Sequence, residues 1–475
     1  MTPSGAADLY DVVVIGSGPA GQKAAIQAAK AGRRVAVIER DREVGGSCVH
    51  RGTIPSKSLR EHALRQRVRR VDLMHEPIQS LLDGVGATIA AHDAYMSAQL
   101  ERNHIRLLRG RANFVTPGEL AVRRIDGTLA MVRASIVIIA TGSRPRTPPD
   151  LAVDHEHVLD SDSILSLAYL PRSLLVLGGG VIASEYAATF AALGCKVTQA
   201  DQYERPLGFL DPELTAFYVD ELRRNGGEYI PNAVAVSTKW DGVSQVRAEF
   251  KDGRSLCADK VLVALGRVAN VDGLTLDAAG IALTSRGHIQ VNDELETTAP
   301  GVYAAGDVIG PPALASVSME QGRRAACHAL GLLVPSDPAS RLPCGVYTIP
   351  EIGTVGLDEH EAQRNFGGAI VGRARFEEIA RGQINGCQRG ILKLIADPGG
   401  RRVVGVQIAG DGATELVHIG QLGMAAGLDV DAYVDNVFNF PTMAEAYRIA
   451  ALDIVKQRGR ATGNENLAGV LAAIS

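Results

Sequence analysis

The sequence is poor in aromatic residues and has no excess of either charge. Phe, Trp and Tyr make up 4% of its 475 residues, with a single Trp, and 49 basic and 53 acidic side chains give a formal net charge of -4. A short arginine-rich run at 65–70 is expected to be the solvated face of a helix. Such a sequence lacks the basic surface that attracts nucleic acids and anionic membranes, so we expect neither as a partner.

Long apolar runs and a cysteine framework are also missing. No apolar stretch is long enough to span a bilayer. The segment from Met1 to Asp8 is too short and polar to be a signal peptide, because a strand-like run follows at once. The six cysteines are scattered, without the spacing of a metal site or of a secreted disulfide framework. We therefore expect a cytoplasmic protein without a bound metal.

The sequence is long and rich in glycine. Its 475 residues suffice for about three domains of ordinary size. The 52 glycines and the apolar fraction of 46% indicate tight turns, close backbone approaches and sizeable cores. These features are typical of α/β nucleotide-binding folds.

A glycine turn between a strand and a helix lies near the N-terminus. Residues 10–15 form an apolar, β-branched run, 16–21 a glycine-rich turn, and 22–31 an alanine-rich helix. A second strand, 34–38, follows. This order of strand, turn, helix and strand predicts a dinucleotide-binding unit, and we call residues 16–21 the first cradle.

Each special residue of the first cradle has a chemical reason. Gly16 permits the tight turn, Gly18 lets the backbone approach a pyrophosphate, and Gly21 lets helix and strand pack closely. The helix N-terminus attracts the phosphates. Glu39, at the end of the second strand, can accept hydrogen bonds from ribose hydroxyls. A glycine turn alone could be only structural, but here the strand, helix and terminal acid accompany it.

The same pattern returns at residues 173–201 and predicts a second cradle, residues 178–183. Gly178 and Gly180 repeat the first two glycines, and Asp201 repeats the terminal acid. Ala183 replaces the third glycine, which packs helix on strand and does not touch phosphate. A duplication without binding would have to explain both terminal acids.

Two further strand-to-turn segments, 136–142 and 302–307, suggest that a first nucleotide domain is interrupted by a second and then resumes. Beyond them, 389–395 and 401–408 are expected to be neighbouring strands and 413–426 a helix, in a unit without a cradle. The predicted boundaries are 1–155 and 271–340 for the two parts of the first nucleotide domain, 156–270 for the second nucleotide domain and 341–475 for the C-terminal domain.

These residues resemble one family over essentially the whole chain, the pyridine nucleotide-disulfide oxidoreductases of class I. The first cradle with Glu39 looks like the family's FAD site, Thr141 and Gly142 like its linking motif, and Asp307 like its second FAD contact, at the ribityl chain. The second cradle looks like its nicotinamide nucleotide site, and 346–351 like the opening of its dimerisation domain.

The resemblance implies a fold, cofactors and partners. The fold class is α/β, with two Rossmann-like dinucleotide-binding domains, for FAD and NAD(P), and a C-terminal α+β dimerisation domain. The cofactors are FAD, NAD and NADP. The partners are nicotinamide dinucleotides and a second copy of the chain, in a homodimer or higher homo-oligomer.

The sequence departs from the family at two positions that disulfide chemistry requires, the second cysteine and the C-terminal histidine. The family's redox motif has two cysteines; here Cys48 is followed by Thr53 at the second position, and a hydroxyl cannot enter thiol–disulfide exchange. The family's C-terminal histidine, a proton shuttle, is Phe440 here, and a benzyl side chain is neither acid nor base. Hydride traffic between nucleotides and flavin is the chemistry that remains.

This combination is similar to the branch of the family that passes hydride from NADPH to NAD+, or the reverse, through the flavin. Lys57 and Glu185 match the family's ion pair beside the flavin and are the predicted catalytic residues, tuning the ring electrostatically. A dehydrogenase or diaphorase that uses quinone or another acceptor would share these motifs. A third alternative is an FAD-bound redox sensor that uses Cys48.

Several other residues could be taken for chemical groups. Cys48 is interpreted as a relic packed against the ring, and His50, with no visible orienting carboxylate, as structural. Glu415 and His418 share one helical face, but their segment is apolar and expected to be buried at a dimer interface. Near Asp201, which suits an NAD ribose, Arg205 could instead pair with a 2′-phosphate, and the sequence leaves that preference open.

Overall fold

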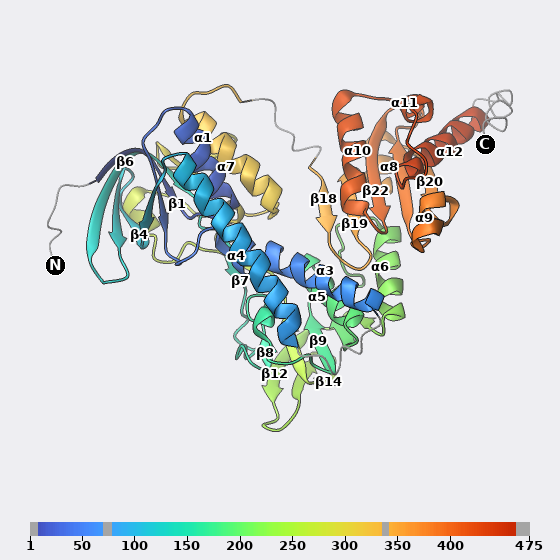
Figure 1. Cartoon of the computed structure of the whole chain (residues 1–475), viewed down its shortest axis with the longest axis horizontal. Helices are drawn as coiled ribbons and strands as arrows, with labels where there is room; N and C mark the ends of the chain where they lie inside the picture. Colours follow the sequence, from blue (N-terminus) through green and yellow to red (C-terminus); the bar gives the residue numbers. More distant parts are fainter. Residues whose placement is uncertain (1–7, 70–77, 335–341, 462–475) are drawn as a thin grey trace. The chain divides into compact units, whose positions relative to one another are not determined.

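A computed structural model of the chain describes residues 8–69, 78–334 and 342–461 (Figure 1). Position 70 of the arginine run and residues 1–7 therefore lie outside the described residues. The chain folds as two compact units. The first contains Met1–Pro149, Val153–Leu170 and Ala264–Ser336, and the second contains Asp150–Ala152, Pro171–Val263 and Asp337–Ser475.

The first unit is built on a sheet in the order β3-β2-β1-β6-β5-β4, with β17 also paired to β6. β1, β2, β3 and β17 run parallel to their partners, whereas β4, β5 and β6 form an antiparallel meander. Its strands are β1 (Asp8–Ile15), β2 (Val35–Glu39), β3 (Arg106–Arg109), β4 (Arg111–Thr116), β5 (Glu119–Arg123), β6 (Leu129–Ile139) and β17 (Val302–Ala304), with the short strands β7 (Ser143–Pro145), β8 (Val158–Leu159) and β16 (Arg267–Ala269).

Helices cover one face of this sheet. Alternate residues of β1 point to opposite faces: Val12 and Val14 pack with the helices, and Val13 and Ile15 pack toward the meander. α1 and α7 lie side by side (Figure 1). The helices of this unit are α1 (Pro19–Lys30), α2 (Gly46–His50), α3 (Thr53–Arg69), α4 (Ile78–Arg102) and α7 (Ala315–Ala329), with 3₁₀ turns at Ile164–Ser166, Leu276–Ala279 and Asp307–Ile309.

The second unit opens with another parallel sheet, in which β11, β10, β9 and β15 lie side by side in that order. The antiparallel strands β12, β13 and β14 form a separate small sheet. The elements of this part are β9 (Ser173–Leu177), α5 (Val181–Ala192), β10 (Lys196–Ala200), α6 (Pro212–Arg224), β11 (Glu228–Ile230), β12 (Ala235–Trp240), β13 (Val246–Phe250), β14 (Ser255–Ala258) and β15 (Lys260–Val263).

The C-terminal part of the second unit is an antiparallel sheet in the order β18-β19-β22-β21-β20. α10 packs on β19 and β22, and α12 packs on β20 and β21. Its elements are β18 (Cys344–Val346), β19 (Ile352–Gly356), α8 (Glu359–Phe366), β20 (Ile370–Arg375), α9 (Ala380–Asn385), β21 (Ile391–Ala396), β22 (Val403–Ala409), α10 (Ala413–Ala426), α11 (Val430–Asp435) and α12 (Glu445–Ala461), with a 3₁₀ turn at Phe376–Glu378.

The predicted fold class is confirmed, with small shifts at element ends. α10 has the predicted bounds, and β21 and β22 pair as expected. α1 begins at Pro19, three residues before the predicted start of that helix at residue 22. Within the described ranges, no helix is both long and apolar enough to cross a membrane.

Candidate functional site

The first cradle joins β1 to α1, and its backbone packs closely at Gly16 and Gly21. Gly16 has φ 102°, and its N–H donates to the carbonyl of Ile38 over 2.8 Å. A Cβ on Gly16 would overlap the carbonyl oxygen of Ala140, and one on Gly21 would overlap that of Gly16. Protein geometry alone therefore requires glycine at these two positions.

Gly18 is different, because nothing in the protein requires it to be glycine. It caps α1 with φ -65° and ψ -176°, a conformation open to any residue. A Cβ there would meet no closer atom than the carbonyl oxygen of Gly45, at 4.0 Å. The space in front of the α1 N-terminus thus fits the pyrophosphate that the sequence predicts there.

Glu39 ends β2 beside the cradle and is 5% exposed. Its Oε2 accepts hydrogen bonds from the amide N–H of Ser17 over 2.9 Å and from its Oγ over 2.7 Å, and its Oε1 accepts one from the Asp41 N–H. Ser17 Oγ also accepts a hydrogen bond from the Gly45 N–H. The sequence analysis did not single out Ser17, although its place between Gly16 and Gly18 could have identified it.

Thr141, Gly142 and Asp307 lie close together in the first unit. The buried Thr141 hydroxyl has no hydrogen-bond partner among the described residues, as expected of a group that awaits a ligand. Asp307 Oδ2 accepts a hydrogen bond from Ser143 Oγ over 2.7 Å. β17 makes this meeting possible, because it returns the chain to β6.

Two side chains that the sequence did not single out hold this turn. Asn270 donates from Nδ2 to the Thr141 carbonyl over 3.0 Å, and Arg267 donates from Nε to Ser143 Oγ over 2.7 Å. Their partners lie 124 to 129 residues away in the chain. No local pattern could have identified them.

Cys48 and Thr53 lie together at the start of α2 and α3. Burial raises the pKa of the Cys48 thiol, and the hydrogen bond from the Thr53 side chain only partly opposes this. A thiol with a raised pKa holds little thiolate, the reactive form. The geometry therefore supports the interpretation of Cys48 as a packed residue without a redox partner at this motif.

The structure also shows the surroundings of His50, Glu415 and His418. His50 Nε2 is 2.8 Å from the Val44 carbonyl, and Asp93, which the sequence did not reveal as a neighbour, is 3.9 Å away. Glu415 and His418 are exposed on this single chain, and His418 contacts Gln421. Among the described residues, no cluster of three His, Cys, Asp or Glu side chains could hold a metal ion.

The second cradle repeats the backbone of the first between β9 and α5. Gly178 has φ 129°, and its N–H donates to the Ala200 carbonyl over 2.8 Å. Gly180 caps α5 with φ -81° and ψ -177°, and a Cβ there would meet nothing within 4 Å. Ala183 is fully buried. Here too the open position in front of a helix N-terminus fits a pyrophosphate.

Asp201 lies directly against this cradle. A Cβ on Gly179 would overlap its carboxylate, which also accepts backbone hydrogen bonds from Gly179, Gln202 and Tyr203. Burial outweighs these bonds and raises the pKa of Asp201 above the ordinary value. Arg205, the alternative phosphate ligand, instead donates to the carbonyls of Leu210 and Gly208 over 2.9 and 3.1 Å.

The two predicted catalytic residues belong to different units, and their pairing stays a prediction. Lys57 follows Ser56 in α3, and its Nζ lies 3.4 Å from Ser56 Oγ. Glu185 is 7% exposed in α5, and its Oε1 accepts a hydrogen bond from the Tyr347 N–H over 2.9 Å.

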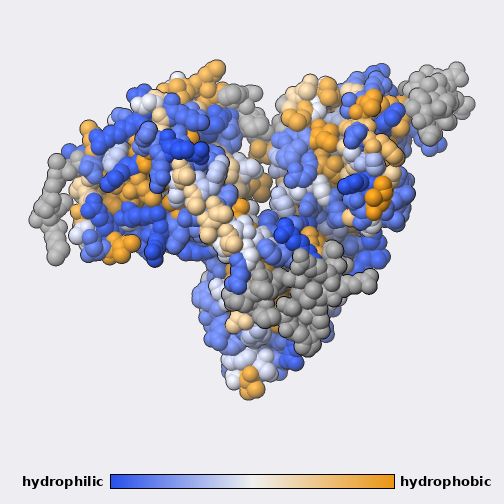
Figure 2. All heavy atoms as spheres, in the orientation of Figure 1, coloured by the Kyte–Doolittle hydropathy of each residue, from blue (hydrophilic) through white to orange (hydrophobic). Residues whose placement is uncertain are grey.

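Apolar side chains are exposed on the C-terminal part of the second unit, and Figure 2 shows apolar patches there. Phe440, at the position of the family's histidine, is 69% exposed, and Val437 is 90% exposed. Ile384 and Leu422 are likewise exposed. Contiguous exposed apolar patches mark surfaces that bind another protein, whereas single exposed apolar side chains are common on any protein.

Comparisons with known proteins agree with this geometry. Residues 10–322 match the family model described as pyridine nucleotide-disulphide oxidoreductase, and 342–451 match that family's dimerisation domain. Proteins named soluble pyridine nucleotide transhydrogenase from Mycobacterium tuberculosis and Klebsiella pneumoniae are 44% and 41% identical to the chain, over 94% of it and 97% of each relative.

Solved structures of similar proteins share the fold. LpdA from Mycobacterium tuberculosis is 28% identical with a TM-score of 0.87, over 93% of this chain and 99% of that one. A Cu(II) complex of the HOCl-induced flavoprotein disulfide reductase RclA from Escherichia coli is also 28% identical, with a TM-score of 0.86, over 94% and 99%. On these matches and on its two cradles, the chain belongs to the pyridine nucleotide-disulphide oxidoreductase family.

Proposed function

We propose that this protein is an NAD(P)+ transhydrogenase that moves hydride from NADPH to NAD+, or the reverse, through a bound FAD and without a redox-active disulfide. The observation that carries the proposal is the contact between Cys48 and Thr53, because a hydroxyl occupies the place of the second thiol. The relatives named soluble pyridine nucleotide transhydrogenase support the same activity.

The residues of the first unit fit FAD. In the proposed complex, Gly18 leaves room for the pyrophosphate, and Glu39 accepts hydrogen bonds from the ribose hydroxyls. In the same complex, Thr141, Gly142 and Asp307 contact the ribityl chain. When bound, FAD supplies a ring that accepts hydride from one nicotinamide and returns it to another. Lys57 and Glu185 are the proposed residues that stabilise charge beside that ring.

The residues of the second unit fit a nicotinamide nucleotide. Gly178, Gly180 and Ala183 form the turn that would hold its pyrophosphate, and Asp201, whose carboxylate lies against Gly179, is the proposed acceptor of hydrogen bonds from the ribose. Positioning of this kind is what hydride transfer needs most from a protein, since the rate depends on donor and acceptor geometry.

The proposed assembly is a homodimer. The dimerisation domain and the exposed Val437 and Phe440 support it. The six free cysteines support the cytoplasmic location predicted from the sequence. The proposed domain boundaries remain 1–155, 156–270, 271–340 and 341–475.

An anaerobic assay with purified protein, NADPH and an NAD+ analogue tests the function. We expect hydride to reach the analogue, and we expect no reduction of lipoamide or glutathione disulfide. Arsenite, which binds reduced dithiols, should not inhibit. Electron transfer to quinones without transfer to the NAD+ analogue would show a diaphorase instead, and strong arsenite inhibition would show a dithiol elsewhere in the chain.

A further inference from the structure

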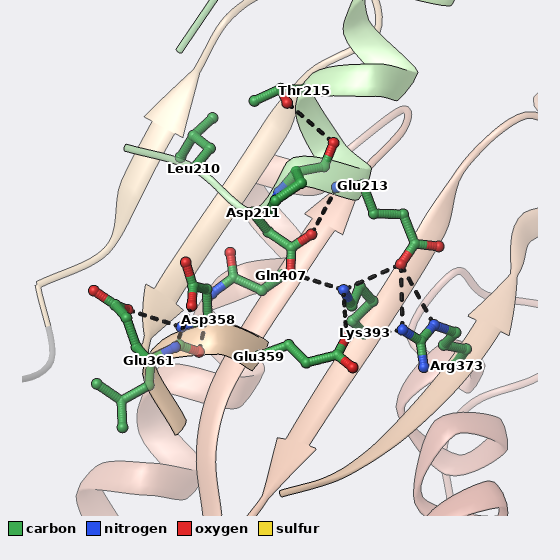
Figure 3. Close-up of polar contacts among 12 residues, drawn as sticks. Leu210, Asp211, Glu213, Thr215, Asp358, Glu359, Glu361, Arg373, Lys393 and Gln407 are labelled. Carbon is green, nitrogen blue, oxygen red and sulfur yellow. Dashed lines mark hydrogen bonds and ion pairs between the residues drawn. The ribbon is translucent and has the colours of Figure 1, made fainter. Parts of the chain in front are cut away.

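An ion cluster with a buried centre lies in the second unit, on α6, α8 and the C-terminal sheet (Figure 3). Its centre is Lys393 in β21, which is 2% exposed. Lys393 Nζ lies 2.7 Å from Asp211 Oδ2, 3.1 Å from Glu213 Oε2 and 3.0 Å from Glu359 Oε2. Arg373 contacts Glu213 and Glu359 as well. No step of the proposed reaction uses these side chains.

Lys393 stays charged in this setting. Burial alone would lower the pKa of its ammonium, but the hydrogen bond to Asp211 and the nearby negative charge outweigh burial and raise it. A buried ammonium is costly to desolvate and is retained only with several good partners. Removing the lysine would therefore leave the buried carboxylate of Asp211 without its cation.

Asp211 connects this cluster to the loop that borders the second cradle. Its Oδ1 accepts the Glu213 N–H over 2.8 Å and so caps α6. Residues 202–210 run from Asp201 to this cap. Within them, Arg205 donates to the Leu210 and Gly208 carbonyls and fixes the loop internally.

The loop reaches the cradle itself through Leu207. The Leu207 N–H donates to the carbonyl of Gly179 over 2.7 Å. Leu207 is 1% exposed and has φ 50°, a left-handed conformation that a leucine adopts only when its surroundings impose it. Leu210, the neighbour of Asp211 in the chain, donates its N–H to the Leu207 carbonyl over 2.8 Å, which links Asp211 through Leu207 to the glycine turn.

α6 offers a second attachment that does not reach the loop. At its other end, Arg389 forms ion pairs with Asp220 and Glu221. Arg389 also comes from the C-terminal part of the chain, directly before β21. The two attachments are alike in partners and differ in their distance along α6 from the cradle.

We propose that Lys393 is a positioning residue for the second cradle: by holding Asp211 it fixes residues 202–211 against Gly179 and so sets the affinity for the nicotinamide nucleotide. The inference rests on the proposed function only in taking this cradle as the nucleotide site. It makes nucleotide binding depend on the C-terminal part of the chain.

Calorimetric titration of the oxidised holoenzyme with NAD+ and NADP+ tests this. For Lys393→Met we expect Kd to rise about ten-fold for both nucleotides, and KM with it, with kcat within about two-fold of wild type. Lys393→Arg should restore most of the affinity, since it keeps the charge. Arg389→Met is the matched control, and it should leave Kd within about two-fold even where it lowers the melting temperature.

Equal changes of Kd in the two methionine variants, or no change in either, would overturn the proposal. This outcome differs from a failure of the proposed function. If the wild-type protein binds both nucleotides but transfers no hydride between them, the transhydrogenase assignment is wrong. The Kd values of the variants would still test the role of Lys393.

Arg205→Met tests the role of the loop independently, and it can be used even if Lys393→Met folds poorly. Because the guanidinium holds the loop, we expect weaker binding of NAD+ and NADP+ to the same extent. A selective loss of NADP+ affinity would show that Arg205 contacts the 2′-phosphate, and it would contradict the loop-fixing role on which the proposal depends.

Discussion

The two cradles have nearly the same backbone but differ in what surrounds them. The first is enclosed by distant parts of its own unit, because Gly16 packs against Ala140 and Ser17 Oγ accepts a hydrogen bond from the Gly45 N–H. The second is bordered by one loop, residues 202–210 after β10, in which the Leu207 N–H donates to the Gly179 carbonyl. In both, the helix-capping glycine faces open space.

This difference teaches how one motif can serve two kinds of ligand. A turn that several segments enclose suits a cofactor that stays bound, since all of them would have to move for release. A turn bordered by one loop suits a substrate that enters and leaves at every turnover, because a single segment decides its affinity.

The largest expected effect comes from placing a carboxylate in either open position. Gly180→Glu should abolish flavin reduction by NADPH, because the side chain would fill and repel the pyrophosphate site, and FAD should stay bound. Gly18→Glu should instead give protein without FAD. Absorbance spectra and anaerobic stopped-flow reduction measure both. Loss of FAD from a folded Gly180→Glu variant would refute the assignment of the two cradles.

The third position of the motif should separate the cradles by stability. Gly21→Ala forces a methyl group onto the Gly16 carbonyl, and we expect a loss of about 2–3 kcal/mol and weaker FAD binding. Ala183→Gly, the matched change in the second cradle, should cost only about 1 kcal/mol, the usual helix penalty of glycine. Chemical denaturation measures both, and equal losses would mean that the two helices pack alike.

Acid should weaken the second cradle before an ordinary aspartate would titrate. Burial raises the pKa of Asp201, so its carboxylate gains a proton at a higher pH than the usual value of 3.8. As the pH falls toward that raised pKa, NAD+ affinity should drop by about three-fold, since a protonated carboxyl is a poorer acceptor. Titrations between neutral and mildly acidic pH test this, and Asp201→Asn should bind weakly with no such slope.

The smallest effect is expected at Cys48, beside the first cradle. Cys48→Ser should keep the transhydrogenation rate within about three-fold, because hydride transfer does not pass through sulfur. Since burial raises the pKa of this thiol from 9.0, its alkylation by iodoacetamide should accelerate only above that pH. Mass spectrometry follows the labelling. Abolished transfer in Cys48→Ser would show that a thiol takes part after all.

The sequence predicted the parts of the site that local patterns determine. The strands and helices around both cradles, and the placement of Glu39 and Asp201 at strand ends, follow from the period of apolar residues and from the spacing of glycines. Asn270 and Arg267 escaped notice because their partners are more than a hundred residues away. The sequence left open whether Arg205 pairs with a 2′-phosphate, and no sequence pattern shows that its guanidinium donates to the carbonyls of Leu210 and Gly208.

The pairing of β17 with β6 also determines when the first unit can be completed during synthesis. Asp307 follows its partner Ser143 by 164 residues, and the strands of the second parallel sheet are translated in between. At about 5–20 residues per second, the ribosome needs roughly ten to thirty seconds to deliver that side chain. Until then the edge of β6 at Val137–Ile139 lacks its partner strand, so the first unit is completed only after the second parallel sheet has been synthesised.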